Sequence, residues 1–162
     1  MEQAYRVHVA KDYLKFAAAH FIAYRGFREP LHGHNYQVSV QVEGGLGHDG
    51  YVLDFGLVKQ AAKRVCERLD ERVLLPVESD CLTFELAGGQ VAVTYEDGSR
   101  FSFPEADIVL LPIVHTSAEE LARYVLSQIR AEFPDLEHRG VRSIEVGVAE
   151  APGQIAYCRE RI

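Results

Sequence analysis

The alternation of apolar and polar residues after two closely spaced histidines is the feature that most restricts how this chain can fold. The segment Leu31–Tyr36 reads Leu-His-Gly-His-Asn-Tyr, so His32 and His34 are two residues apart. Residues two apart on a β-strand point to the same face of a sheet. The histidine face continues with residues at every second position: Tyr36, Val38, Val40 and Val42. The pattern therefore predicts a long strand with both imidazoles on its buried side.

A second short run supplies a third imidazole. The segment Phe16–Phe21 is apolar apart from His20, and antiparallel pairing with the first strand would bring His20 beside His32 and His34. Neutral imidazole is a good zinc ligand, and three protein ligands leave a fourth coordination position for water or substrate, as in catalytic zinc sites. We therefore predict a zinc site on these three histidines. The alternative is that they form ordinary hydrogen bonds within the core.

The composition bounds the class of protein. A chain of 162 residues with 48% hydrophobic content fits one well-buried domain spanning 1–162. The formal net charge of −7 disfavours nucleic acid or an anionic membrane as the main partner, because both attract basic surfaces. No apolar run approaches the ~18 residues of a membrane span, and the first residues lack a signal-peptide pattern, so we expect a cytoplasmic protein. Three cysteines without Cys-x-x-Cys spacing argue against a disulfide framework or a thiolate metal site.

Two segments have the pattern of amphipathic helices. Asp54 can cap a helix over about residues 56–69, where apolar residues recur at helical spacing. A second helix is expected to begin at Thr116 or Ser117, because each is followed three residues later by a glutamate, as in a capping box.

Strand patterns occupy much of the remaining chain. Between about residues 79 and 108, β-rich runs flank a Glu-Asp-Gly turn at 96–98, which predicts a hairpin. Residues 144–148 alternate as a strand whose apolar face ends at Glu150. The order of strands, helix, hairpin, helix and strands predicts an α+β fold.

Several segments together resemble the 6-pyruvoyltetrahydropterin synthase and 6-carboxytetrahydropterin synthase family. The similarity covers most of the chain outside about residues 79–108, where this sequence has a longer β-hairpin insertion. The matching segments stand in the order found in the family: Phe16–His20, Leu31–Tyr36, Val52–Gly56, Leu69–Asp70, Thr116–Ala122 and Glu150.

The resemblance implies a tunnelling fold, in which an antiparallel sheet carries two helices on one face and the subunits form a barrel, commonly a homohexamer of two trimers with sites between subunits. It implies zinc on His20, His32 and His34, in agreement with the coordination argument. It also places the pterin-anchoring glutamate at Glu150, whose carboxylate can accept hydrogen bonds from pterin N–H groups. Ser117 is a further substrate-binding candidate. The alternative for Glu150 is a solvated strand end.

Family members act on 7,8-dihydroneopterin triphosphate, so the resemblance implies a lyase that forms a 6-carboxy, 6-pyruvoyl or 6-hydroxymethyl type of pterin. Two customary residues are missing. The usual cysteine ahead of the His-Gly-His segment is absent, with Arg28 four residues before His32, and the histidine that normally follows Leu-Asp is Glu71. Asp70 and Glu71 are therefore either a residual catalytic proton relay or an acidic helix terminus.

Glu29 is the candidate replacement for the missing thiol base. It stands three residues before His32, as in a variant branch of the family with the spacing Glu-x-x-His-x-His, whose members resemble enzymes that form 6-hydroxymethyl-dihydropterin. A carboxylate beside zinc and partly removed from water can have its pKa tuned to accept a proton. The alternative is that Glu29 pairs with Arg25 or Arg28 in a surface loop.

Two other classes of function stay open at this point. The chain could be a non-catalytic pterin or purine binder that has kept the metal site, an alternative motivated by Arg28 and Glu71. It could also be an unrelated β-rich metalloprotein, because other β-barrel metal sites use the same His-x-His spacing. Pterin affinity without product would indicate the binder, and tight pterin binding that depends on Glu150 would exclude the unrelated metalloprotein.

Overall fold

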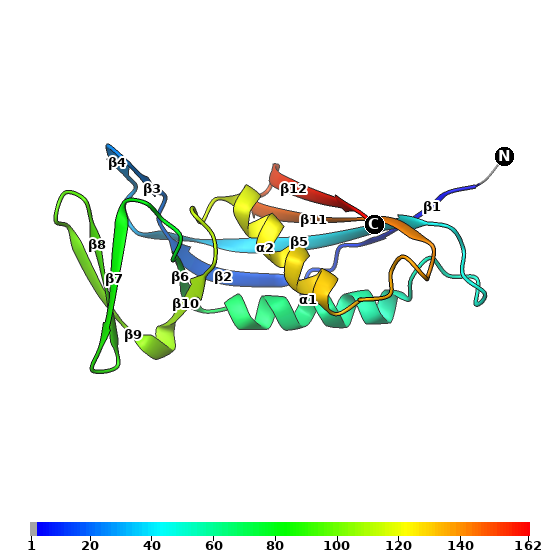
Figure 1. Ribbon diagram of the computed structural model, residues 1–162, viewed down its shortest axis with the longest axis horizontal. Coiled ribbons are helices and arrows are strands. Elements are labelled where there is room, and N and C mark those ends of the chain that lie inside the picture. The colour runs from blue at the N-terminus through cyan, green and yellow to red at the C-terminus, as the bar shows by residue number, and fades with distance from the viewer. Residues whose placement is uncertain (1–2) are drawn as a thin grey trace.

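Two helices cover one face of a seven-stranded sheet in the computed structural model, which describes residues 3–162 (Figure 1). The sheet order is β10-β6-β2-β5-β11-β12, and β1 also pairs with β5. The strands are β1 (Tyr5–Val9), β2 (Lys15–His20), β5 (His32–Gly44), β6 (Arg72–Pro76), β10 (Ile108–Leu111), β11 (Val141–Ala151) and β12 (Gln154–Arg161). The helices are α1 (Phe55–Leu69) and α2 (Ala118–Ala131). The predicted α+β class is confirmed.

The long strand β5 organises the sheet, since β2 and β1 pair with one of its edges and β11 pairs with the other. Its predicted alternation is confirmed, because Tyr36 and the valines that follow at every second position are buried in the core with the two helices. The expected antiparallel pairing of β2 with β5 is also present, and it places His20 directly opposite His32.

The sheet is mixed, which corrects one detail of the expected antiparallel arrangement. β6 pairs parallel with the end of β2, and β10 pairs parallel with β6. Because β6 is parallel to β2 and β2 is antiparallel to β5, β6 also runs opposite to β5. The helix α1 connects β5 to β6 along the chain. A helical crossover of this kind allows a strand to join a sheet without a tight hairpin.

Both helices begin where their capping residues predict. Asp54 and Ser117 each accept a hydrogen bond from a backbone N–H in the first turn of their helix. The Glu120 carboxylate does not complete a capping box on Ser117 and instead accepts from the backbone N–H groups of Val114 and His115. It thereby fixes the loop that leads into α2. Within residues 3–162, neither helix is long and apolar enough to cross a membrane.

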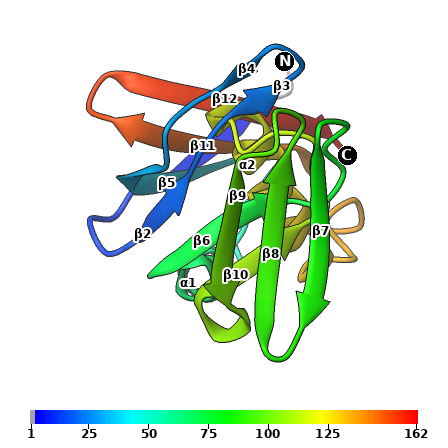
Figure 2. The same cartoon turned by 90° about the vertical axis from the view of Figure 1, so that its left-hand side faces the viewer.

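The inserted segment forms a separate sheet at one end of the molecule (Figure 2). The expected hairpin is present as β8 (Gln90–Tyr95) and β9 (Arg100–Pro104), and β7 (Leu82–Ala87) adds a third strand. A second hydrophobic core, which includes Phe21, Leu75 and Val93, joins this inserted sheet to the main fold. The remaining elements are β3 (Ala23–Tyr24), β4 (Phe27–Arg28) and the 3₁₀ turn η1 (Glu105–Asp107).

We expect Asp54→Ala to lower the free energy of unfolding by about 1 kcal/mol, because the first turn of α1 loses its side-chain cap. Urea denaturation of the purified variant measures this change. Asp12→Ala, at an exposed turn before β2, removes the same charge and should change stability by less than about 0.5 kcal/mol. Equal losses in the two variants would contradict the capping explanation.

Candidate metal centre

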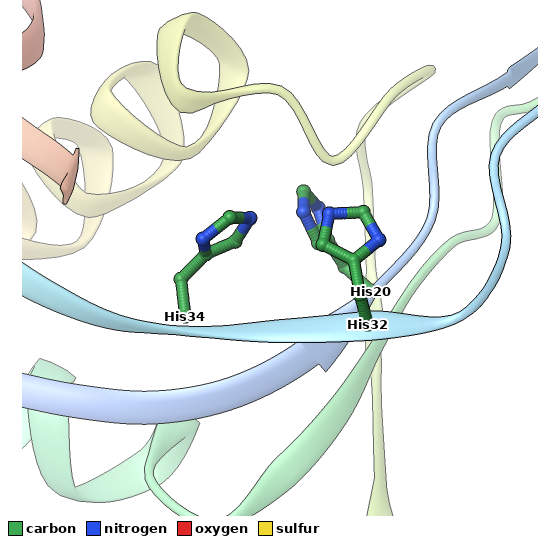
Figure 3. Close-up of side chains that lie close together, drawn as sticks. All are labelled: His20, His32 and His34. Atoms are coloured by element: carbon green, nitrogen blue, oxygen red, sulfur yellow. The ribbon is translucent and has the colours of Figure 1, made fainter.

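Three histidines from two adjacent strands converge on one point (Figure 3). His20 lies opposite His32 across the β2–β5 pair, and His34 follows on the same face of β5. One ring nitrogen from each histidine lies within 4.8 Å of those from the other two. The structure thus brings together the three residues that the sequence predicts as metal ligands.

Backbone carbonyls fix the orientation of two of these rings. The Nδ1 atom of His20 lies 2.8 Å from the carbonyl oxygen of Thr116, and Nδ1 of His32 lies 2.8 Å from the carbonyl oxygen of Pro30. Because a carbonyl oxygen only accepts hydrogen bonds, each Nδ1 carries the proton and each Nε2 presents its lone pair. This is how metal-binding histidines are usually held by their surroundings.

The Nε2 atoms of His20 and His34 are buried and have no hydrogen-bond partner. One carboxylate oxygen of Glu150 lies 3.5 Å from the first and 3.2 Å from the second. Burial lowers the pKa of His20 and so favours its neutral form, which is the metal-binding form. A cation at this point would satisfy the buried and unpaired Nε2 atoms of His20 and His34. The donor set therefore fits a divalent metal ion.

Tyr36 lies next to His20 and His34 on the buried side. Its ring stacks on Phe16 and meets the rings of His20 and His34 nearly edge-on. Burial raises the pKa of the Tyr36 hydroxyl, which therefore stays protonated. The packed rings of Tyr36 and Phe16 give the ligands a rigid support.

Glu29 lies at the rim of the histidine cluster. One of its carboxylate oxygens accepts a hydrogen bond from the backbone N–H of Ile22 at 3.0 Å, and the other lies 3.7 Å from Nε2 of His32. The alternative, in which the Glu29 carboxylate pairs with Arg25 or Arg28, does not match the observed contacts. Arg25 lies near Asp80 and Glu96, and Arg28 donates to the backbone carbonyl of Glu29 instead of its carboxylate.

A pocket of about 570 Å³ opens beside the histidines. The pocket is lined on the side of the histidine cluster by His32, His34, Glu29 and Glu150. The pocket is completed by the first turn of α2 and the start of β12, with the residues Ile22, Ser117, Ala118, Glu119, Gln154, Ile155, Ala156 and Tyr157. Its volume falls in the range of small-molecule sites.

Two predicted catalytic residues lie outside this pocket. Asp70 lies at the end of α1, and its carboxylate accepts a hydrogen bond from the backbone N–H of Ala17 in β2. Glu71 has a left-handed backbone, with φ of 55°, and lines a different, open hollow with Ala17 and Asn35. Ala17 and Asn35 alternate with the buried positions of β2 and β5, so their side chains lie on the opposite face of the sheet from those of the three histidines.

Sequence reasoning missed several residues of the site. Thr116 orients His20 although it is distant in sequence, and its only visible signal is its place in the motif that starts α2. Gln154 and Tyr157 line the pocket from β12, and no spacing rule in the sequence singles them out.

Comparisons with known proteins give one family. The sequence profile of 6-pyruvoyl tetrahydropterin synthase matches residues 9–161. A protein of Methanocaldococcus jannaschii, provisionally named 6-carboxy-5,6,7,8-tetrahydropterin synthase, is 33% identical over 148 residues, which cover 91% of this chain and 90% of that protein. The chain belongs to the 6-pyruvoyl tetrahydropterin synthase family.

Solved structures of the family agree closely with this chain. Plasmodium falciparum 6-pyruvoyl tetrahydropterin synthase matches with a TM-score of 0.96 and 44% identity, over 99% of this chain and 100% of that one. A Plasmodium vivax 6-pyruvoyltetrahydropterin synthase, in which a catalytic glutamate is replaced by alanine, matches with a TM-score of 0.95 and 41% identity over the same shares. Because 99% of this chain is covered, the inserted sheet is common to these structures.

Membership in the 6-pyruvoyl tetrahydropterin synthase family confirms the resemblance and the tunnelling fold. It places the chain among pterin-processing enzymes of the lyase type, and the three-histidine group is compatible with the metal dependence of such enzymes. The hypothesis of an unrelated β-rich metalloprotein is therefore wrong.

We expect His34→Ala to weaken binding of a divalent metal ion by roughly a hundredfold or more, since replacement of groups that merely orient a ligand already costs up to that factor. Titration of metal-free protein with Zn²⁺ measures the affinity. The control is His48→Ala, which removes an exposed imidazole outside the pocket. Unchanged affinity in His34→Ala would contradict the assignment of the site.

Proposed function

We propose that the protein is a zinc-dependent lyase that converts 7,8-dihydroneopterin triphosphate into a 6-substituted pterin. The observation that supports this most is the convergence of three histidines, two with unpaired buried Nε2 atoms, at the edge of a pocket that also holds Glu29. Three imidazole ligands suit zinc and leave one position for substrate. When bound there, zinc would hold the side-chain hydroxyls of the substrate, lower their pKa and polarise the developing carbonyl.

Glu29 is proposed as the general base. Its carboxylate is held by the Ile22 N–H on one oxygen, while the other oxygen faces the pocket side near His32. This leaves one oxygen free to take a proton from the substrate side chain. The catalytic glutamate named for the Plasmodium vivax enzyme supports a carboxylate in this role. A glutamate base in place of a cysteine favours a 6-hydroxymethyl product over the 6-pyruvoyl or 6-carboxy alternatives.

Glu150 and Ser117 are proposed to bind the substrate. Glu150 lies at the end of the apolar face of β11, next to the metal ligands and in the pocket wall. Its carboxylate could accept hydrogen bonds from the amino and ring N–H groups of a pterin. Ser117 lines the same pocket, and its hydroxyl hydrogen stays available as a donor although its oxygen caps α2.

Asp70 and Glu71 are proposed to act in an assembled form of the protein. Within one chain neither residue lines the pocket beside the histidines, so they would serve a site completed between copies, in the homohexamer of two trimers that the resemblance implies. The competing candidate is a pterin binder without turnover, motivated by the missing cysteine and histidine at Arg28 and Glu71.

We expect the zinc-loaded protein to convert 7,8-dihydroneopterin triphosphate, and Glu29→Gln to lower kcat by roughly a hundredfold or more, because the amide cannot accept the proton. Mass spectrometry identifies the pterin that is formed. Glu85→Gln, an exposed residue of β7, is the control and should turn over like the wild type. Unchanged turnover in Glu29→Gln would exclude Glu29 as the base, and pterin binding without product in the wild type would indicate the binder.

We expect Glu150→Gln to weaken pterin binding roughly tenfold to a hundredfold, because hydrogen bonds to a charged acceptor are lost. Isothermal titration with dihydroneopterin measures this affinity. Zinc content, measured on the same sample, should stay that of the wild type. Loss of zinc with unchanged pterin affinity would mean that Glu150 is a metal ligand and not the pterin anchor.

A further inference from the structure

The hairpin β3–β4 links the metal site to the inserted sheet. Glu29 directly follows β4, and its backbone N–H donates to the carbonyl of Ile22 at 2.9 Å. Because the Glu29 carboxylate also accepts from the Ile22 N–H, the backbone and side chain of Glu29 are both bound to the short segment between β2 and β3 that follows His20. The position of the carboxylate therefore depends on the position of this hairpin.

Arg28 connects the hairpin to the inserted sheet. Its guanidinium carbon lies 5.9 Å from the ring centre of Phe21 and 5.2 Å from that of Phe101 in β9. The two rings also stack on each other, with their centres 4.8 Å apart. A guanidinium at these distances from aromatic faces is attracted by their negative electrostatic potential. Arg28 also donates from Nη1 to the carbonyl oxygen of Glu29 at 2.9 Å.

The inserted sheet holds the same hairpin at its turn. The Tyr95 hydroxyl donates to the carbonyl oxygen of Tyr24 at 2.8 Å, and the Gly26 N–H donates to the Glu96 carboxylate at 2.6 Å. Arg25 lies close to Glu96 and Asp80, on the same side. The inserted sheet thus contacts the hairpin at both its turn and its exit.

We infer that Arg28, held against Phe101 of the inserted sheet, is a positioning residue for Glu29. This inference rests on the proposed role of Glu29 as the base. Arg28 contacts the backbone of Glu29 and not its carboxylate, so its effect is on geometry. A base that is misplaced by about 1 Å loses much of its effect on rate, which gives this support a function beyond stability.

The test uses Arg28→Met in the full chain loaded with zinc. Methionine keeps an unbranched apolar stem but removes the charge and the donor to the Glu29 carbonyl. We expect kcat to fall on the order of tenfold to a hundredfold with little change in KM, because binding groups such as Glu150 are untouched. Hydrogen–deuterium exchange of the metal-free protein should become faster in residues 22–31 and stay unchanged in α1.

Two further variants make the test specific. Arg100→Gln removes an exposed arginine from the same inserted sheet and should leave both kcat and the exchange of residues 22–31 unchanged. Phe101→Leu removes the ring but keeps an apolar side chain, and it should reproduce the effects of Arg28→Met in weaker form. If Arg28→Met is poorly folded, Phe101→Leu carries the test.

The outcomes separate this inference from the proposed reaction. Wild-type kcat and wild-type exchange in Arg28→Met would overturn the inference, as would faster exchange over the whole chain, which would indicate a purely structural role. In a protein with Glu29→Gln, Arg28→Met should cause no further loss of turnover, since both changes act on one group. A wild type without product would refute the proposed function, while the exchange of residues 22–31 would still decide whether Arg28 holds this segment.

Discussion

The pairing of β2 with β5 is the interaction on which the candidate site depends. In this register His20 lies opposite His32, and the two-residue period of β5 adds His34 on the same face. A shift of one residue would turn His20 to the other face of the sheet and separate the ligands. The register is held by the same apolar residues that build the main core, so packing of the core and assembly of the site are one requirement.

Besides this strand pairing, the site has backbone carbonyls that orient two of the imidazole rings, and the Nε2 atoms of His20 and His34 have no hydrogen-bond partner. The carbonyl oxygens of Thr116 and Pro30 accept hydrogen bonds from Nδ1 of His20 and His32, and Tyr36 packs against the rings of His20 and His34. Burial of unpaired acceptors is unfavourable in the metal-free chain, and a bound cation relieves it. The arrangement is therefore one in which binding of a metal ion would stabilise the fold as well as supply chemistry.

The second hydrophobic core gives the site another support. Phe21 follows His20 directly and packs into the core shared with the inserted sheet, so the candidate metal ligand His20 and the Glu29 hairpin meet the insertion through neighbouring residues. Because the insertion packs against Phe21 and the Glu29 hairpin, its position affects where the residues of the pocket lie. This makes the inserted sheet part of the framework of the site, although none of its strands lines the pocket.

The sequence by itself determined the features that depend on local period and capping: the buried face of β5, both helix starts, the three histidines and the strand whose apolar face ends at Glu150. Only the tertiary structure decided that Thr116 orients His20, that β6 and β10 pair in parallel, that β7 joins the insertion, and that Glu71 lies outside the pocket beside the histidines. The period of a strand or helix depends on neighbouring residues and can be read from the sequence. The contacts decided by the tertiary structure join segments that are distant in the sequence, and the connections between elements determine how those segments pack, so no local pattern predicts them.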